Sequence, residues 1–152
     1  MKTYIRVGRC FKEVPDYIGM FYDGKIFTTE RTDRSYAVCY DQRGTICYLA
    51  KIEFELGTFT FDDAIALTRA RNVKMPNPCI PYHRLPYLPT REQAMMAFSR
   101  CPILRTTHYS FAWTQEEYSG GYAWNLDWYD GDVGPYHKSK LSYVRLFFEI
   151  NL

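Results

Sequence analysis

The chain has 152 residues, of which 47% are hydrophobic and 24% are charged, and these proportions fit one domain with a single hydrophobic core. Its 14 Tyr, 10 Phe and 3 Trp residues exclude a disordered chain, because disordered segments are poor in aromatic side chains. The net charge of +2 is far below that of a domain that neutralises many phosphates, so nucleic acid is not expected as a partner.

The first half of the chain predicts short strands separated by turns. Segments rich in β-branched and aromatic residues lie at residues 4–7, 18–22, 25–29, 36–40 and 45–52. The dipeptide Asp23-Gly24 is typical of a hairpin turn, since glycine accepts a positive φ without a steric penalty.

Two helices are expected in the middle of the chain. Thr60, followed by two aspartates in the first turn, predicts a helix that runs to about Arg71. Thr90 and Gln93 have the spacing of a capping box and predict the start of the second helix. Residues 75–89 lie between them and contain five prolines, which predicts a long, fixed loop.

The last forty residues predict strands with one buried apolar face each. Apolar and polar residues alternate over residues 122–129 and again over residues 143–150. In the first segment the apolar face holds Tyr122, Trp124, Leu126 and Trp128; in the second it holds Val144, Leu146, Phe148 and Ile150. We therefore expect Trp113, Trp124 and Trp128 to be structural residues of the core.

Cysteine usage favours reduced, mostly buried thiols. Five cysteines form an odd set without a C-x-x-C pair, and the three histidines do not fall at metal-ligand spacings with them. The N-terminal residues show no secretory signal, and no apolar run approaches the roughly 20 residues of a membrane-spanning helix. We expect no membrane insertion and a cytoplasmic or phage-associated location rather than classical secretion.

Several motifs together resemble the Lcl C-terminal domain family, long listed as a domain of unknown function. They are W-T-Q-E-E-Y-S-G-G-Y-A-W at 113–124, N-L-D-W-Y-D-G-D-V at 125–133, S-Y-V-R-L at 142–146, T-F-D-D-A at 60–64 and L-P-T-R-E at 88–92. The resemblance covers residues 18–150, with departures at Pro86-Tyr87, where the family has Trp-Arg, and at Phe148, where it often has Arg. It implies an α+β, C-type lectin-like domain over residues 1–152, with small antiparallel sheets, two helices, a long loop region and paired N- and C-terminal strands.

The polar side of the terminal segment is the candidate ligand-binding face. Residues 113–137 contain five acidic residues and no Lys or Arg, which gives either a solvated face or one that attracts a cation or a basic partner. The candidate binding residues combine amphipathic rings with hydrogen-bonding groups: Tyr118, Asn125, Asp127, Tyr129, Asp130, Asp132, Tyr136 and His137. Arg145 matches the family's Y-V-R position and is expected to be structural, through an ion pair or bonds to the backbone.

Neither metal binding nor catalysis is favoured. Asp127, Asp130 and Asp132 could offer oxygen ligands to calcium, but the chain lacks the E-P-N, Q-P-D and W-N-D triplets of calcium-binding lectins. The cysteines match none of the positions of the catalytic pair in the related formylglycine-generating fold, so no catalytic residue, cofactor or metal is assigned.

The main hypothesis is therefore a non-catalytic module that recognises a protein or glycan ligand. Two alternatives stay open besides an enzyme of the formylglycine-generating type. One is an adhesion or receptor-binding protein of a phage or mobile element, including the variable protein of a diversity-generating retroelement. The other is a structural subunit whose aromatic face forms a homo-oligomer.

Overall fold

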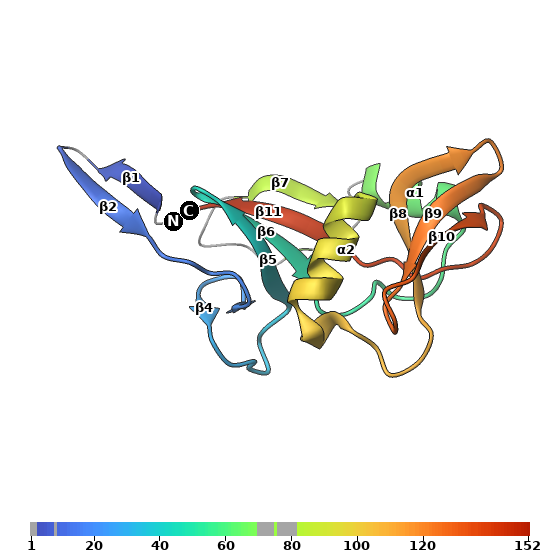
Figure 1. The fold of residues 1–152 in the computed structure, drawn as a ribbon, viewed down its shortest axis with the longest axis horizontal. Helices are drawn as coiled ribbons and strands as arrows, with labels where there is room; N and C mark the ends of the chain where they lie inside the picture. Colours follow the sequence, from blue (N-terminus) through green and yellow to red (C-terminus); the bar gives the residue numbers. More distant parts are fainter. Residues whose placement is uncertain (1–2, 8, 70–74, 76–81) are drawn as a thin grey trace.

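The fold combines two α-helices with antiparallel β-sheets in an α+β arrangement (Figure 1). The computed structural model describes residues 3–7, 9–69, 75 and 82–152. Neither of the described helices is long and apolar enough to cross a membrane.

A six-stranded sheet forms the larger layer of the fold, in the order β4-β3-β5-β6-β11-β7. Its strands are β3 (Phe21–Tyr22), β4 (Phe27–Thr28), β5 (Ala37–Arg43), β6 (Ile46–Lys51), β7 (Tyr82–Tyr87) and β11 (Phe147–Asn151). All neighbours are antiparallel. The C-terminal strand β11 therefore lies inside the sheet, between β6 and β7, and not at its edge.

A smaller three-stranded sheet, in the order β10-β9-β8, lies at the far end of the molecule (Figure 1). It consists of β8 (Phe111–Ser119), β9 (Tyr122–Asp127) and β10 (Val133–His137). At the opposite end, β1 (Thr3–Val7) and β2 (Cys10–Val14) form a hairpin that extends away from the large sheet (Figure 1). The N-terminal strand β1 pairs with β2 in this hairpin and not, as the sequence predicted, with the C-terminal strand. The C-terminal strand β11 pairs instead with β6, the strand before the first helix.

Both helix starts are confirmed. Helix α1 spans Phe61–Arg69, and the backbone amide of Asp63 donates to Thr60 Oγ1 at 3.3 Å. Helix α2 spans Arg91–Arg100 and begins with a complete capping box, in which Thr90 and Gln93 bind each other's backbone amides. Local spacing is enough to predict these ends because the capping groups satisfy amides that have no partner within the helix.

The prediction of a loop throughout residues 75–89 is wrong for Tyr82–Tyr87, which form β7. Strand β7 is the edge strand of the large sheet, so one of its sides has no neighbouring strand. A proline, which has no N–H group to donate, is tolerated in such a strand. Its pairing with β11 is also irregular, with register shifts on both sides of Glu149. Residues 76–81 of the predicted loop lie outside the described part of the chain.

The predicted alternation of the closing strand is wrong as well. Every residue from 144 to 150 is buried, because both faces of β11 are covered. Phe147 packs on the side of α2, with its ring 5.2 Å from that of Tyr40. Phe148 packs on the opposite side, stacked against Tyr36 with ring centroids 5.8 Å apart. A strand buried on both faces needs no alternation of apolar and polar residues.

Arg145, in the segment before β11, is a buried donor to backbone carbonyls. It is 3% exposed, and its guanidinium donates to the carbonyls of Leu104, at 2.6 Å, and of Ile52, at 3.2 Å. The same group lies 4.4 Å from the ring centroid of Phe54 and 4.3 Å from that of Trp128. Burial lowers the pKa of Arg145, and the two carbonyls and two ring faces supply the electron-rich surroundings that a buried cation needs.

Candidate functional site

A pocket of about 530 Å³ opens on one face of the small sheet, near the turn that joins β9 to β10. We call it the aromatic–acidic pocket. Its residues come from β8, β9, β10 and the two adjoining turns; they are Tyr109, Phe111, Asn125, Asp127, Asp130, Asp132, Val133, Gly134 and Tyr136.

Asp127 builds the turn at the mouth of the pocket. Its side chain is 1% exposed, and Oδ1 accepts hydrogen bonds from the backbone amides of Ser110, at 2.9 Å, and Tyr129, at 3.0 Å. The carbonyl of Asp127 accepts from the amide of Gly131, whose φ of 82° lies in the region that favours glycine. The buried carboxylate therefore belongs to the framework of the turn.

Asn125 forms the floor of the pocket. It is fully buried, and its Nδ2 lies 3.5 Å from Ser142 Oγ, but its Oδ1 has no hydrogen-bond partner among the described residues. A buried acceptor without a partner costs about 1–3 kcal/mol, so such groups are expected to meet a ligand or an ordered water. Gly134 pairs with Asn125 across the sheet, and a Cβ placed on Gly134 would have no atom within 4 Å. Open space therefore lies beside the buried amide.

Aromatic rings and carboxylates form the walls. Tyr136 packs on Phe111 with ring centroids 4.9 Å apart, and Tyr109 meets Tyr129 edge to face at 5.1 Å. Burial raises the pKa of Tyr136, and the negative charges of Asp127, Asp130 and Asp132 raise it further. Three carboxylates thus act on the same ring, and no Lys or Arg is among the described residues that line the pocket.

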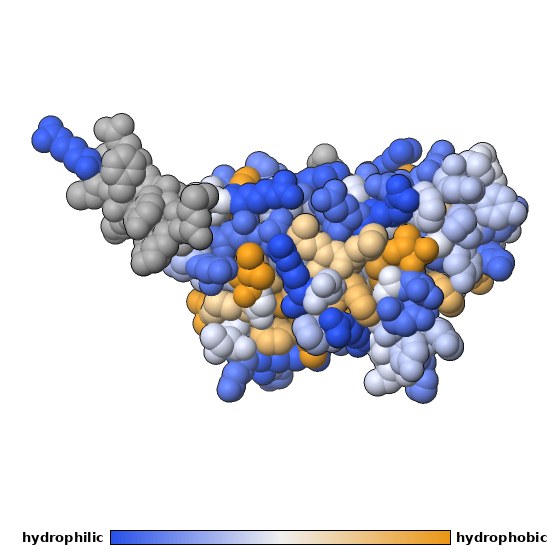
Figure 2. All heavy atoms as spheres, viewed as in Figure 1, coloured by the Kyte–Doolittle hydropathy of each residue, from blue (hydrophilic) through white to orange (hydrophobic). Residues whose placement is uncertain are grey.

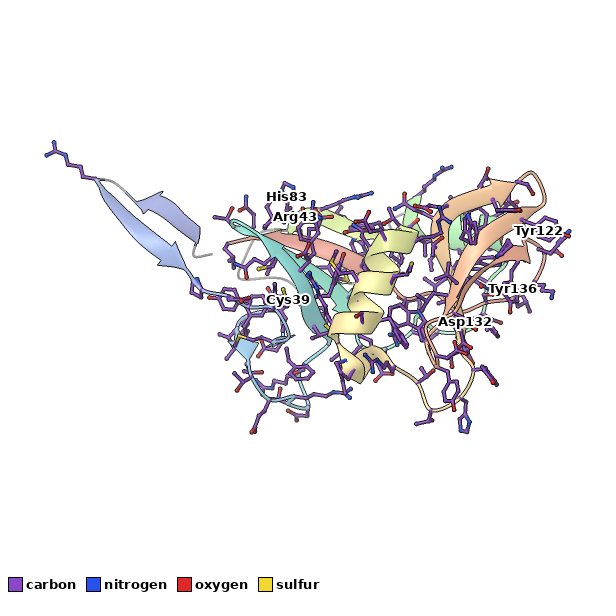
Figure 3. The ribbon with its side chains drawn as sticks, in the orientation of Figure 1. Cys39, Arg43, His83, Tyr122, Asp132 and Tyr136 are labelled. Carbon is purple, nitrogen blue, oxygen red and sulfur yellow. The ribbon has the colours of Figure 1, made fainter. Side chains whose placement is uncertain are left out.

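The aromatic–acidic pocket contains five of the eight predicted binding residues, namely Asn125, Asp127, Asp130, Asp132 and Tyr136. Tyr129 lies at the rim, in contact with Tyr109. Figure 3 shows Asp132 and Tyr136 near each other at the small sheet, with Tyr122 toward its outer end.

Two predicted binding residues lie elsewhere. Tyr118 packs edge to face on Trp124, with ring centroids 5.1 Å apart. Trp124 and Asn125 are consecutive in β9 and therefore point to opposite faces of the sheet, so Tyr118 does not share the pocket face. His137 packs against the ring of Tyr122 at 5.4 Å.

The predicted faces of β9 are partly reversed. Ala123, Asn125 and Asp127 are buried, whereas Tyr122 is 44% exposed and Trp124 is only half-buried. The prediction that Trp124 is a core residue is therefore wrong, and so is the exposed position expected for Asn125 and Asp127. Trp113 and Trp128, by contrast, are each 1% exposed.

Packing against the two helices explains this reversal. Ala123 lies in a buried cluster with Trp113 and with Phe61 of α1, so the face that carries small and polar residues points inward. On the other face, the Trp124 ring is covered from α2 by the guanidinium of Arg91, at 4.2 Å from the ring centroid. Apolar residues still gather on the surface at the junction of α2 with the small sheet (Figure 2).

The sequence prediction did not include Tyr109, Phe111, Val133 and Gly134. The available signal was the spacing of Phe111 and Trp113, which places both on one face of a strand. Phe111 also pairs directly with Asp127. That pairing joins residues sixteen positions apart and depends on the register of β8 and β9.

The described residues contain no group of three or more His, Cys, Asp or Glu side chains that could hold a metal ion. Cys39, Cys47 and Cys101 are free and buried, which confirms the thiol prediction for these three. A hydrogen bond with Cys47 and burial raise the pKa of Cys39, and burial raises that of Cys101 to about 11. The side chains of Cys10 and Cys79 lie outside the described part of the chain.

Comparison with known proteins gives no assignment, since neither a protein-family model nor a curated protein matches this sequence.

Proposed function

We propose that the chain is a non-catalytic binding module with a C-type lectin-like fold, which holds a protein or glycan ligand in the aromatic–acidic pocket. The order of elements supports this fold. Strand β6 precedes α1 and pairs with the C-terminal strand β11, and both helices and the small sheet lie between them in sequence. This arrangement resembles the paired terminal strands and two flanking helices that are implied by the resemblance to the Lcl C-terminal domain family.

The observation that carries the proposal is the unsatisfied amide oxygen of Asn125 beside open space at Gly134. A buried acceptor without a partner lowers the stability of the fold. The residue paired with it across the sheet is a glycine, so no side chain fills the space opposite Asn125. Tyr136 and Asp132 add a ring and a carboxylate beside this acceptor, and such a combination orients a ligand by hydrogen bonds and ring contacts.

A non-catalytic role agrees with the chemistry of the buried thiols. Cys39 and Cys101 have raised pKa values, whereas a nucleophilic cysteine needs a lowered one. Their burial also keeps them away from a substrate in solution.

The test fills the pocket without disturbing the fold. Gly134 lies in an edge strand, its φ is not in the left-handed region and a Cβ there meets no atom within 4 Å, so we expect the strand to accept Gly134→Val, which adds a residue with a high strand propensity. We expect an unchanged or slightly higher melting temperature, together with loss of the signals that the wild-type chain gives on a glycan array and a peptide array. Gly120→Ala is the matched control, since Gly120 also has open space around its Cβ position but lies in the β8–β9 turn, outside the pocket.

Two outcomes contradict the proposal. If Gly134→Val keeps every signal of the wild type on both arrays, the pocket is not the binding site. If the folded wild-type chain gives no signal on either array, the binding role itself is rejected.

A further inference from the structure

The charge of the aromatic–acidic pocket is unbalanced. Asp127, Asp130 and Asp132 line it, no basic residue is found beside them in the part of the chain that the structure describes, and their combined field acts on Tyr136. The one cation placed on this ring by the described contacts is Lys140, whose Nζ lies 5.2 Å from the Tyr136 ring centroid. Lys140 is exposed and does not line the pocket, so the interior stays negative.

The carboxylates are poorly arranged for a metal ion. Asp127 Oδ1 already accepts from two backbone amides, and Asp130 Oδ1 accepts from the amide of Asp132 at 2.9 Å. Calcium needs six to eight oxygen ligands, whereas three aromatic rings occupy the walls here. An organic cation has other requirements, because ring faces attract it and a single acceptor can bind one of its N–H groups.

The polar groups of the pocket also favour a ligand that donates hydrogen bonds. Acceptors predominate among the side-chain groups of the residues that line the pocket: the three carboxylates accept only, and Asn125, whose Nδ2 is a donor, adds the partnerless Oδ1. Ammonium and guanidinium groups donate hydrogen bonds and accept none, whereas a sugar hydroxyl does both. The acceptor-rich pocket therefore fits a cation better than a sugar.

We infer that the aromatic–acidic pocket binds the ammonium or guanidinium group of a Lys or Arg side chain on a protein partner. This inference rests on the proposed function and names its ligand class. The rim favours a protein over a free polyamine, since Tyr109 is 69% and Tyr129 is 46% exposed there. Exposed tyrosines give protein interfaces a large, rigid contact area around such an anchor.

The test uses small probes and the side-chain amide signal of Asn125 in NMR spectra of the full chain. The cationic probes are the N-acetyl methylamides of lysine and arginine, and the neutral control is that of norleucine, which has a similar alkyl chain. We expect the cationic probes alone to shift the Asn125 signal, with millimolar affinity that falls as salt is added.

Matched variants identify the groups responsible. Asp130→Asn with Asp132→Asn should weaken lysine-probe binding about 3- to 10-fold, because each exposed charge pair contributes little by itself. Lys140→Ala should strengthen it about twofold by removing a competing cation from Tyr136. Gly134→Val should abolish the shift. A lysine-containing heptapeptide should bind at least as tightly as spermidine.

The contrary outcomes separate this inference from the proposed function. An equal shift with the norleucine probe rejects cation recognition but keeps the pocket as a ligand site. Cation recognition is also rejected, and the pocket also remains a ligand site, if no cationic probe shifts the Asn125 signal while Gly134→Val still removes signals on the arrays. Spermidine that binds more tightly than the heptapeptide rejects the protein partner, and array signals that survive Gly134→Val reject both proposals.

Discussion

Replacement of Asp127 separates a structural role from a ligand-binding role within the pocket. Asp127→Ala removes the acceptor that the backbone amides of Ser110 and Tyr129 share, at a position that is 1% exposed. A hydrogen bond to a charged group contributes about 1.5–3 kcal/mol, and the two bonds are not additive because they end on one oxygen. We expect the free energy of unfolding to fall by about 2–4 kcal/mol.

The assay is urea unfolding followed by fluorescence, with the midpoint and the slope fitted separately. Asp127→Asn keeps an acceptor oxygen in the same place and should cost about 1 kcal/mol. Asp132→Ala is the control, because this exposed side chain should change stability by less than about 0.5 kcal/mol. An Asp127→Ala protein as stable as the control would refute the assignment of Asp127 to the framework of the turn.

Two further predictions concern buried groups outside the pocket. Arg145→Met should lower the free energy of unfolding by about 3 kcal/mol, because the carbonyls of Leu104 and Ile52 lose their donor, and Arg145→Lys should recover less than half of the loss in the same urea assay. For Cys101, the pKa is raised from 9.0 to about 11, so the folded state binds the proton more tightly than the unfolded state. The contribution of Cys101 to the free energy of unfolding is constant below pH 9 and is lost as the pH rises through about 11. The slope of this loss is at most about 1.4 kcal/mol per pH unit. Cys101→Ala should flatten the fall in melting temperature between pH 9 and 11, and an unchanged pH profile would contradict this.

The two helix starts could be predicted because their determinants lie within four residues of each other. Thr90 and Gln93 satisfy each other's backbone amides without help from the rest of the fold. The Asp23-Gly24 turn is equally local, with Gly24 at a φ of 97° and the amides of Lys25 and Ile26 bound to Asp23 Oδ1.

The strand faces could not be predicted from alternation, because burial depends on what covers each face. Phe147 and Phe148 point in opposite directions, yet both are fully buried between α2 and an aromatic cluster from the first half of the chain. In β9, the small side chain of Ala123 allows close packing against α1, whereas Trp124 stays half-buried beneath Arg91 and Tyr118. Alternation shows that two faces differ, but long-range packing decides which face is inside.

The pocket was partly predictable because one turn holds most of its polar groups. Asp127, Asp130 and Asp132 lie within six residues, so any compact turn keeps their charges near each other. Phe111 and Gly134 enter from neighbouring strands through the pairing register, which sequence spacing alone does not define.

The hydrogen bonds of Asp127 also explain how the carboxylates of the pocket are positioned before a ligand binds. A buried carboxylate is costly unless it accepts hydrogen bonds, and two backbone amides donate to Asp127 here. The position of this carboxylate is therefore fixed by the turn before a ligand arrives, and the exposed Asp130 and Asp132 extend the acidic group toward the rim. A cationic side chain then meets carboxylates that need no rearrangement, which lowers the cost of binding. Substitutions at Asp127 should consequently affect folding first, whereas those at Asp130 and Asp132 should affect ligand affinity alone.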